Sequence, residues 1–198
     1  MKSTIPSHQF KSDYLHLHIL ETDRLILRPL KREDSQEAFK NWSSDPNVAK
    51  YTTWEAHKSE KETKEFIDGV ISNYNANLMD SWGIILKASN RLIGTGGYTP
   101  GSKKGNICTI GYALSKKYWN RGIMTEAVRK MVEYGFSHLQ PSRIQSYTNI
   151  EHIASQRVLE KIGFKFEGVL RNYCFHHGIP IDVKMFSILA SEVINNEL

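Results

Sequence analysis

The chain has 198 residues, which is enough for one well-buried domain and too few for two of ordinary size. A hydrophobic content of 40% with 24% charged residues is ordinary for a globular protein, and no apolar run approaches the roughly 18 residues of a membrane-spanning helix. The net charge of +5 suits a phosphate-bearing ligand or a modest surplus of solvated lysines, but no block of about five like charges suggests a nucleic-acid-binding arm. The two cysteines, Cys108 and Cys174, form no metal-ligand cluster with histidines. We therefore expect a cytoplasmic protein without a metal, and neither a membrane nor a nucleic acid as its partner.

The first part of the chain predicts a short strand and two helices. Residues 1–20 are a polar lead in which Tyr14, Leu15, Leu17 and Ile19 could extend a strand. A strand is expected over residues 25–30, stopped at Pro29, and then a helix capped by Asp34. That helix carries Ala38, Phe39 and Trp42 on one face, and residues 45–47 read as a turn. A capping box at Ser59 and Glu62 opens the second helix, whose apolar face holds Phe66, Ile67, Val70, Ile71, Tyr74 and Leu78.

The remainder predicts strands that alternate with helices. Strands are expected over residues 82–86, 92–98 and 107–114, with a flexible basic loop over 100–105. A helix from Thr125 ends before Pro141, and a strand follows over 143–149. The next helix buries Ala154, Val158, Leu159 and Ile162 and ends at Gly163. A closing antiparallel hairpin is expected over 166–175 and 183–189, with a turn at 177–180. We predict an extension over 1–20, one domain over 21–190 and a tail over 191–198.

One turn has the features of a phosphate site. It lies between a strand and a helix, where the first backbone N–H groups of the helix lack partners and the helix dipole adds partial positive charge. Gly122 allows the backbone to approach a ligand closely, and Arg121, Asn120 and Thr125 add a charge, an amide and a hydroxyl. An ordinary helix start with a glycine in a tight turn would explain the same residues.

Several words along the chain resemble the GNAT superfamily of N-acetyltransferases, and more narrowly its Rim-type branch, which includes ribosomal-protein-alanine N-acetyltransferases. The resemblance covers about residues 21–189. It rests on Glu-Thr-Asp-Arg-Leu from residue 21, Ile-Gly-Tyr from 110, Tyr-Trp-x-x-Gly from 118, Thr-Glu-Ala from 125, Ala-Ser-x-Arg-Val-Leu-Glu-Lys-x-Gly-Phe from 154 and Glu-Gly-x-Leu-Arg from 167.

This resemblance implies a fold. It is a single-domain mixed α/β (α+β) GNAT-like architecture with a central mixed, mostly antiparallel twisted sheet of about seven strands and about four flanking helices. A splayed pair of parallel strands, ending near Leu114 and Asn149, would hold CoA.

The resemblance also implies acetyl-CoA as the cofactor, gripped at its pyrophosphate by the turn. Met124 stands where relatives have a small residue, and His152 where they have Asn. Twelve residues are predicted to bind the cofactor: Ala113, Leu114, Trp119, Asn120, Arg121, Gly122, Ile123, Met124, Thr125, Asn149, His152 and Ser155.

The implied reaction is direct attack of a neutral amine on a thioester. Backbone N–H groups near Ala113 and Leu114 would stabilise the developing oxyanion. Many relatives place a Tyr acid where this chain has Leu159, so Ser155, one helical turn earlier, is the candidate proton donor. It could equally be a small packing residue.

The general base is left open by the sequence. Cys174 occupies the position of a family glutamate, and Tyr173, His176, His177 and Asp182 lie near it. A water relay or an amine that arrives deprotonated is an alternative. Glu126 reads as a structural partner of the helix dipole.

The acceptor is an amine, either a peptide N-terminus or a small molecule, and Tyr51 and Trp54 are predicted to line its site. Alternatives are an antibiotic or polyamine acetyltransferase, for which Glu60, Glu62 and Glu65 could form an acidic wall, and a non-catalytic CoA-binding module. A homodimer is left open.

Overall fold

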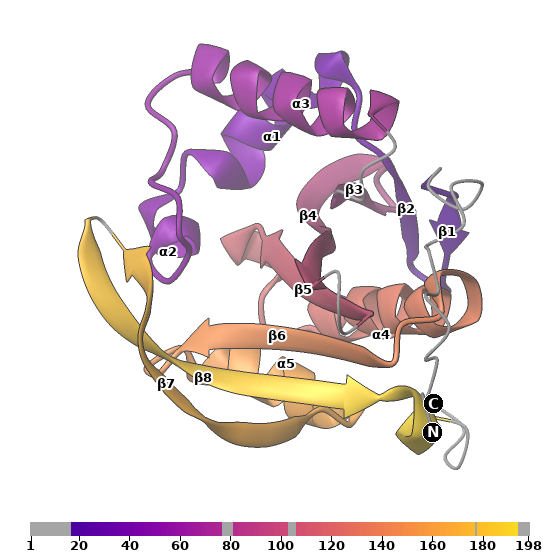
Figure 1. Ribbon diagram of the computed structural model, residues 1–198. Coiled ribbons are helices and arrows are strands. Elements are labelled where there is room, and N and C mark those ends of the chain that lie inside the picture. Colours follow the sequence, from indigo (N-terminus) through magenta and orange to yellow (C-terminus); the bar gives the residue numbers. More distant parts are fainter. Residues whose placement is uncertain (1–16, 77–80, 103–105, 177, 194–198) are drawn as a thin grey trace, which may run out of the picture.

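The computed structural model describes residues 17–76, 81–102, 106–176 and 178–193 (Figure 1). Its strands form one sheet in the order β1-β2-β3-β4-β5-β6-β8-β7. Adjacent strands are antiparallel except β5 and β6, which are parallel. The described part of the chain thus has one strand more than the predicted seven. The strand bounds are β1 Leu20–Glu21, β2 Leu25–Pro29, β3 Ser81–Leu86, β4 Arg91–Ser102, β5 Ile107–Leu114, β6 Arg143–Asn149, β7 Lys165–His176 and β8 Ile179–Leu189.

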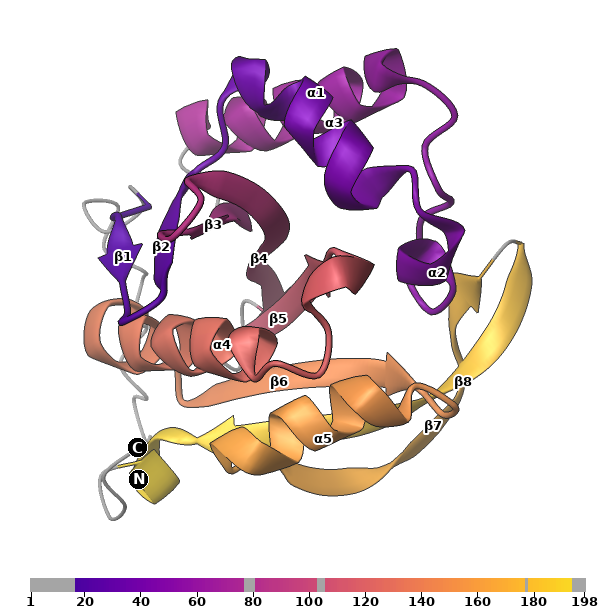
Figure 2. The ribbon, with the colours of Figure 1, turned by 180° about the vertical axis from the view of Figure 1, so that it is seen from behind.

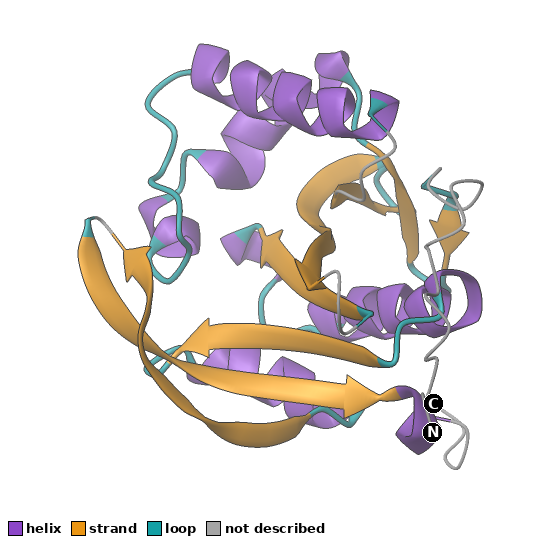
Figure 3. Cartoon of the chain, in the orientation of Figure 1, coloured by secondary structure: helices purple, strands orange, loops and turns teal. Residues whose placement is uncertain are grey.

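Helices cover both faces of this sheet (Figure 3). The described α-helices number six, against about four predicted, because two one-turn helices, at residues 46–49 and 190–193, were not predicted. Their bounds are α1 Ser35–Ala38, α2 Pro46–Ala49, α3 Glu60–Asn75, α4 Ile123–Tyr134, α5 Ile153–Ile162 and α6 Ala190–Val193. Wider π-turns extend α1 over Phe39–Ser43 and α4 over Gly135–Leu139. None of these helices has both the length and the apolar character that a membrane crossing requires.

The hydrophobic core has two parts, one on each face. Side chains of β2 to β6 that face α4 and α5 form the larger part, around the fully buried Trp82 and Met131. The smaller part lies between the other face and helices α1 and α3, around Trp42 and Ile67. Figure 2 shows α4 and α5 together on one side of the sheet and α1 with α3 at the far end. The N-terminal helices are therefore positioned to wall one end of the sheet.

Local predictions about the N-terminal half need two corrections. The segment at residues 45–47 opens α2, because the Asp45 carboxylate accepts the Asn47 N–H at 2.8 Å and Pro46 fits the first helical turn. Asp34 does not cap α1. Its carboxylate accepts the Lys31 N–H and forms a two-pronged ion pair with Arg28, both at 2.7 Å, so it closes the preceding 3-10 turn. The capping box at Ser59 opens α3 as predicted.

Three further boundaries differ from prediction. β4 continues to Ser102 because its ladder with β5 extends beyond Tyr98, so the predicted loop at 100–105 is shortened. β8 begins at Ile179, four residues earlier than expected. Ala154 is exposed and Ser155 is buried instead, since α5 is turned so that Ser155, Leu159 and Ile162 face the sheet. The predictions on Tyr14, Leu15, Leu78 and His177 and on residues 103–105 lie outside the described residues.

Candidate active site

The parallel pair β5 and β6 separates after three residues. Register pairs join Ile107 to Arg143, Cys108 to Ile144 and Thr109 to Gln145, and beyond them the two strands have no mutual register partners. Ser146 Oγ donates to the Ile110 carbonyl at 2.9 Å across the point of separation. We call the opening between residues 110–114 of β5 and 146–149 of β6 the fork. It matches the predicted splayed pair.

The backbone of β5 presents alternate N–H groups to the fork, and Leu114 carries the last of them. The Ser115 N–H donates to the Ile93 carbonyl on β4 at 2.8 Å. In an antiparallel ladder, successive N–H groups point to opposite sides, so the Leu114 N–H points away from β4 and toward the fork. The same alternation turns the Ala113 N–H toward β4. Of the two predicted oxyanion donors, the geometry therefore leaves Leu114 and removes Ala113.

A buried hydroxyl in the fork has no partner among the described residues. Thr148 is 4% exposed, and its Oγ1 makes no hydrogen bond to the described part of the chain. Leaving a buried hydroxyl unpaired costs roughly 1–3 kcal/mol, so such a group usually meets a ligand or water. Thr148 was missed by sequence reasoning, because threonine in a strand is ordinary. A polar chain lying in the fork would satisfy this atom, so the fork fits a pantetheine arm.

The predicted phosphate turn precedes α4. Gly122 is its N-cap residue, with φ of +71°, and Asn120 is also left-handed, with φ of +58°. The first intrahelical bond runs from the Glu126 N–H to the Gly122 carbonyl at 3.0 Å, which leaves the amides of residues 123–125 for another acceptor. A Cβ placed on Gly122 would meet only the Arg24 guanidinium, at 3.7 Å, so the turn is open.

The side chains of Trp119 and Met124 attach the turn to the rest of the domain. Trp119 donates its Nε1–H to the Leu114 carbonyl at 2.8 Å, which ties the turn to the end of β5. Met124 is 7% exposed and packs into the larger core. The bulky Met124 side chain therefore lies on the core side of α4, and only its backbone N–H faces the turn.

Thr22 and Arg24, near the N-terminus, hold this turn in place through Glu126. Glu126 accepts hydrogen bonds from the Thr22 hydroxyl at 2.5 Å and from the Arg24 N–H at 3.1 Å. The Arg24 guanidinium contacts the same carboxylate at 2.6 Å and donates to the Arg121 carbonyl at 3.0 Å. Burial alone raises the pKa of Glu126, but the hydrogen bonds from Thr22 and Arg24 outweigh it and lower the pKa. Glu126 is thus a charged group with a structural role, which agrees with the prediction. Its partners Thr22 and Arg24 are distant in the sequence, so the residues next to Glu126 did not predict them.

Ser155 lies in the first turn of α5 and meets a tyrosine from β5. Its Oγ is 2.9 Å from the Tyr112 hydroxyl, and the residue is only 8% exposed. Burial raises the pKa of Tyr112 well above the ordinary phenol value, more than the contact with Ser155 lowers it, so Tyr112 is protonated at neutral pH. Sequence reasoning named Ser155 and missed Tyr112, since the two are 43 positions apart.

The end of β6 and the start of α5 are closed by local bonds. Asn149 uses its side-chain oxygen to accept the Glu151 N–H at 2.9 Å and its carbonyl to accept the His152 N–H at 3.0 Å. The His152 ring stacks on Tyr51 with centroids 4.6 Å apart. Burial lowers the pKa of His152, so its ring is neutral at neutral pH. Tyr51 is thereby placed beside the N-terminus of α5, whereas Trp54 packs edge-on against Trp42 in the smaller core.

The candidate bases lie on the β7–β8 hairpin. Burial raises the pKa of Cys174, so its thiol stays protonated and is a poor proton acceptor. Tyr173 is 45% exposed and makes an edge contact with Tyr147 at 5.2 Å. The Asp182 carboxylate accepts the Asn172 N–H at 2.9 Å, and His176 Nδ1 contacts the Thr52 carbonyl at 2.8 Å. The side chains of Asp182 and His176 are therefore both engaged with backbone groups of other residues.

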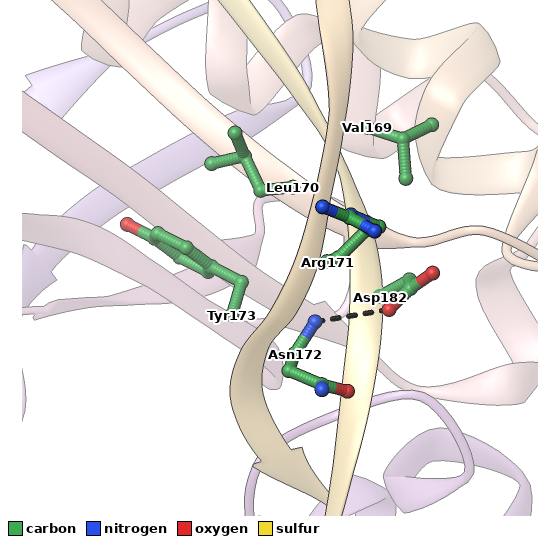
Figure 4. A pocket seen from close by; sticks show the side chains of 6 residues that line it. All are labelled: Val169, Leu170, Arg171, Asn172, Tyr173 and Asp182. Carbon is green, nitrogen blue, oxygen red and sulfur yellow. Dashed lines mark hydrogen bonds between the residues drawn. The ribbon is translucent and has the colours of Figure 1, made fainter.

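An open hollow lies along β7, where a bulge between Leu170 and Cys174 interrupts the ladder. In Figure 4, Leu170 and Tyr173 lie to one side of the strand and Val169 to the other, with the bond from Asn172 to Asp182 closing the bulge. Its lining residues are Val169, Leu170, Arg171, Asn172, Tyr173 and Asp182. Among the described residues, no group of His, Cys, Asp and Glu is arranged to hold a metal.

Comparison with known proteins points to one family. The family model described as "Acetyltransferase (GNAT) domain" matches residues 24–165. The chain is 37% identical over 171 residues to "Uncharacterized N-acetyltransferase YoaA" of Bacillus subtilis (strain 168), covering 86% of this chain and 96% of that protein. The crystal structure of an acetyltransferase (GNAT family) from Bacillus anthracis is 27% identical, with a TM-score of 0.78 over 88% of this chain and all of that one. The ribosomal L7/L12 alpha-N-protein acetyltransferase RimL, in complex with coenzyme A, shares the fold at 17% identity, with a TM-score of 0.78, over 88% of this chain and 99% of that one.

Proposed function

The chain belongs to the acetyltransferase (GNAT) family and is an acyltransferase that uses acetyl-CoA, and from this premise we propose that its acceptor is the α-amine of a peptide or protein N-terminus. Acetyl-CoA supplies an activated thioester when it is bound. The fork and the adjoining turn carry the assignment of its site, because both leave polar groups without partners among the described residues, namely the first amides of α4 and the Thr148 hydroxyl.

The residues of this chain divide the binding work between two ends of the site. The free amides of residues 123–125, with Arg121 and Asn120, hold the pyrophosphate at the positive end of α4. The Thr148 hydroxyl and the unpaired edges of β5 and β6 bind the pantetheine amides. The Leu114 N–H then lies where it can stabilise negative charge on the reacting carbonyl oxygen. Ser155 gives a proton to the departing sulfur.

The lack of a strong base among the described candidates favours a particular acceptor. Cys174 stays protonated, and Asp182 and His176 are engaged with backbone. The amine must then arrive neutral or lose its proton to water. An α-amine has a pKa near 8, so about one molecule in ten is neutral at pH 7, whereas a lysine-like amine with a pKa near 10.4 is neutral in fewer than about one in a thousand. This difference favours a peptide N-terminus over a polyamine.

The alternative of an antibiotic acceptor receives little support from the acidic residues that suggested it. The Glu62 carboxylate accepts the Lys58 N–H, Glu65 pairs with Lys61 on the same exposed helix face, and Glu60 accepts from the Ser35 hydroxyl. These three carboxylates are engaged locally at the start of α3 and form no shared acidic wall. We therefore place the peptide acceptor first and the small cationic amine second.

Calorimetric titration with acetyl-CoA tests the assignment of the site. Gly122→Glu brings a carboxylate to the turn and should weaken acetyl-CoA binding at least tenfold. Gly69→Glu is the matched control, because Gly69 lies exposed in α3 with no atom within 4 Å of an added Cβ. Gly122→Asn keeps the left-handed backbone without a charge and separates strain from repulsion. Equal affinity in wild type and Gly122→Glu would remove the cofactor from this turn.

An acceptor screen tests the second half of the proposal. Peptides with a free N-terminus are compared with the same peptides blocked at the N-terminus but carrying a lysine, and with spermidine and an aminoglycoside. Transfer to the free N-terminus with little transfer to the blocked peptide supports the proposal. Preferred transfer to spermidine or the aminoglycoside would replace it with the small-amine alternative.

A further inference from the structure

The contact between Tyr112 and Ser155 joins two elements that flank the fork. Tyr112 comes from β5, two residues before Leu114, and its ring packs against the larger core on the side of α5. Its hydroxyl lies 2.9 Å from Ser155 Oγ and 3.3 Å from the Ser155 carbonyl. Packing accounts for the ring, but it does not account for a phenol oxygen directed at the one side chain proposed to donate a proton.

The local chemistry favours Tyr112 as the donor in this pair. Ser155 Oγ is the nearer of the two acceptors, and the Ser155 carbonyl belongs to the hydrogen-bond ladder of α5. When the phenol donates to Ser155 Oγ, the serine proton is free to point elsewhere. Ser155 also lies in the first turn of α5, where the helix dipole stabilises negative charge on its oxygen. Leu159, one turn further along α5, is fully buried and has no acidic proton to donate.

We infer that Tyr112 is the positioning residue and proton source behind Ser155, acting through the serine on the sulfur that leaves. This inference rests on the proposed function of Ser155. As the C–N bond forms and the C–S bond breaks, Ser155 Oγ gives its proton to the sulfur and takes the Tyr112 proton. Tyr112 recovers a proton from water, and the amine releases one, so the protons balance.

A thiol placed at position 155 tests the hydrogen bond without any turnover. Ser155→Cys is made in a Cys174→Ala background, where the other thiol, Cys108, is buried with a pKa raised to about 11. Ultraviolet absorbance of the thiolate then gives the pKa of the introduced thiol with and without Tyr112→Phe. A donated hydrogen bond favours the thiolate, so the pKa should be about one unit lower when Tyr112 is present. Equal pKa values would overturn the inference.

Kinetics tests the relay in the working enzyme. Tyr112→Phe keeps the ring and should lower kcat at least tenfold with the KM for acetyl-CoA unchanged. Combined with Ser155→Ala it should cost no more than either change alone, because the pair acts as a unit. Tyr98→Phe is the control, since it removes another buried tyrosine hydroxyl, which donates to the Met131 carbonyl at 2.7 Å in the core.

The two tests separate this inference from the proposed function. Additive losses, or a Tyr112→Phe variant with the kcat of wild type, would overturn the relay while acetyl transfer itself stands. A wild-type protein that acetylates no amine would overturn the proposed acceptor and remove the premise of the relay. The thiol titration would still decide whether Tyr112 donates to position 155.

Discussion

Glu126→Gln tests whether the N-terminal strands hold the phosphate turn in place. The side chain keeps its shape but loses its charge, and it faces three donors from Thr22 and Arg24 at 2.5–3.1 Å. An amide can keep one acceptor oxygen there, but its NH₂ group is directed at remaining donors. Both the ion pair and part of the hydrogen bonding are therefore lost.

The expected cost follows from the exposure of the two partners. A hydrogen bond to a charged group contributes about 1.5–3 kcal/mol when buried, while an exposed ion pair contributes about 0.2–1 kcal/mol. The Arg24 side chain is 47% exposed and that of Glu126 is 20% exposed, so the ion pair counts at the exposed rate. We expect Glu126→Gln to lower the free energy of unfolding by about 2 kcal/mol. For a chain of this length that lowers Tm by about 4–8 °C.

Urea unfolding measures the loss, and calorimetry measures its effect on acetyl-CoA. Because Arg24 also donates to the Arg121 carbonyl, we expect affinity for acetyl-CoA to fall with stability. Since the folded-state pKa of Glu126 is lowered, its contribution is present above pH about 4.5 and is lost as pH falls through the folded value, so wild type and variant should converge in acid. Glu65→Gln, which breaks the exposed pair with Lys61, is the control and should cost under about 0.5 kcal/mol. A Glu126→Gln variant as stable as this control would refute the clamp.

Three other changes have definite expected results. Gly94→Ala places a Cβ 2.4 Å from the Ala113 carbonyl oxygen, so it should lower the free energy of unfolding by about 3 kcal/mol in urea unfolding. Gly69→Ala in exposed α3 is the control and should raise the free energy of unfolding by about 0.5–1 kcal/mol. The opposite order would contradict the register of β4 and β5. Thr148→Val should leave Tm unchanged or higher but weaken acetyl-CoA binding about fivefold by calorimetry, while a lowered Tm with full affinity would mean that the hydroxyl is structural. Burial lowers the folded-state pKa of His152, so the unfolded chain binds more protons and stability falls as pH drops below about 6.5; His152→Gln should reduce the slope of Tm against pH there, and an unchanged slope would show that His152 is not responsible.

Most of the fold could be predicted from the periodicity of apolar residues in the sequence. The bounds of β5 and β6 and the glycine at the end of α5 follow directly from alternation and from the left-handed preference of Gly163, whose φ is +102°. What failed depended on long-range geometry. The rotation of α5 that exposes Ala154 is set by packing against the sheet, and the direction of the Ala113 N–H is set by its ladder with β4.

The candidate site shows the same division. The turn around Gly122 could be predicted because helix-start chemistry is local in sequence. Tyr112, Thr148 and the partners of Glu126 could not, because each acquires its meaning from a residue distant in the chain or from the lack of a partner among the described residues.

The position of β8 between β6 and β7 has a consequence for how the protein is made. β7 joins the sheet through β8 alone, yet it precedes β8 in the chain. While the ribosome is still adding residues 179–189, the nascent β6 has an open edge and β7 has no strand to pair with. We expect the ability to hold acetyl-CoA to appear late and all at once, when that last strand is inserted. A messenger truncated before it should yield a protease target and not a partly working enzyme.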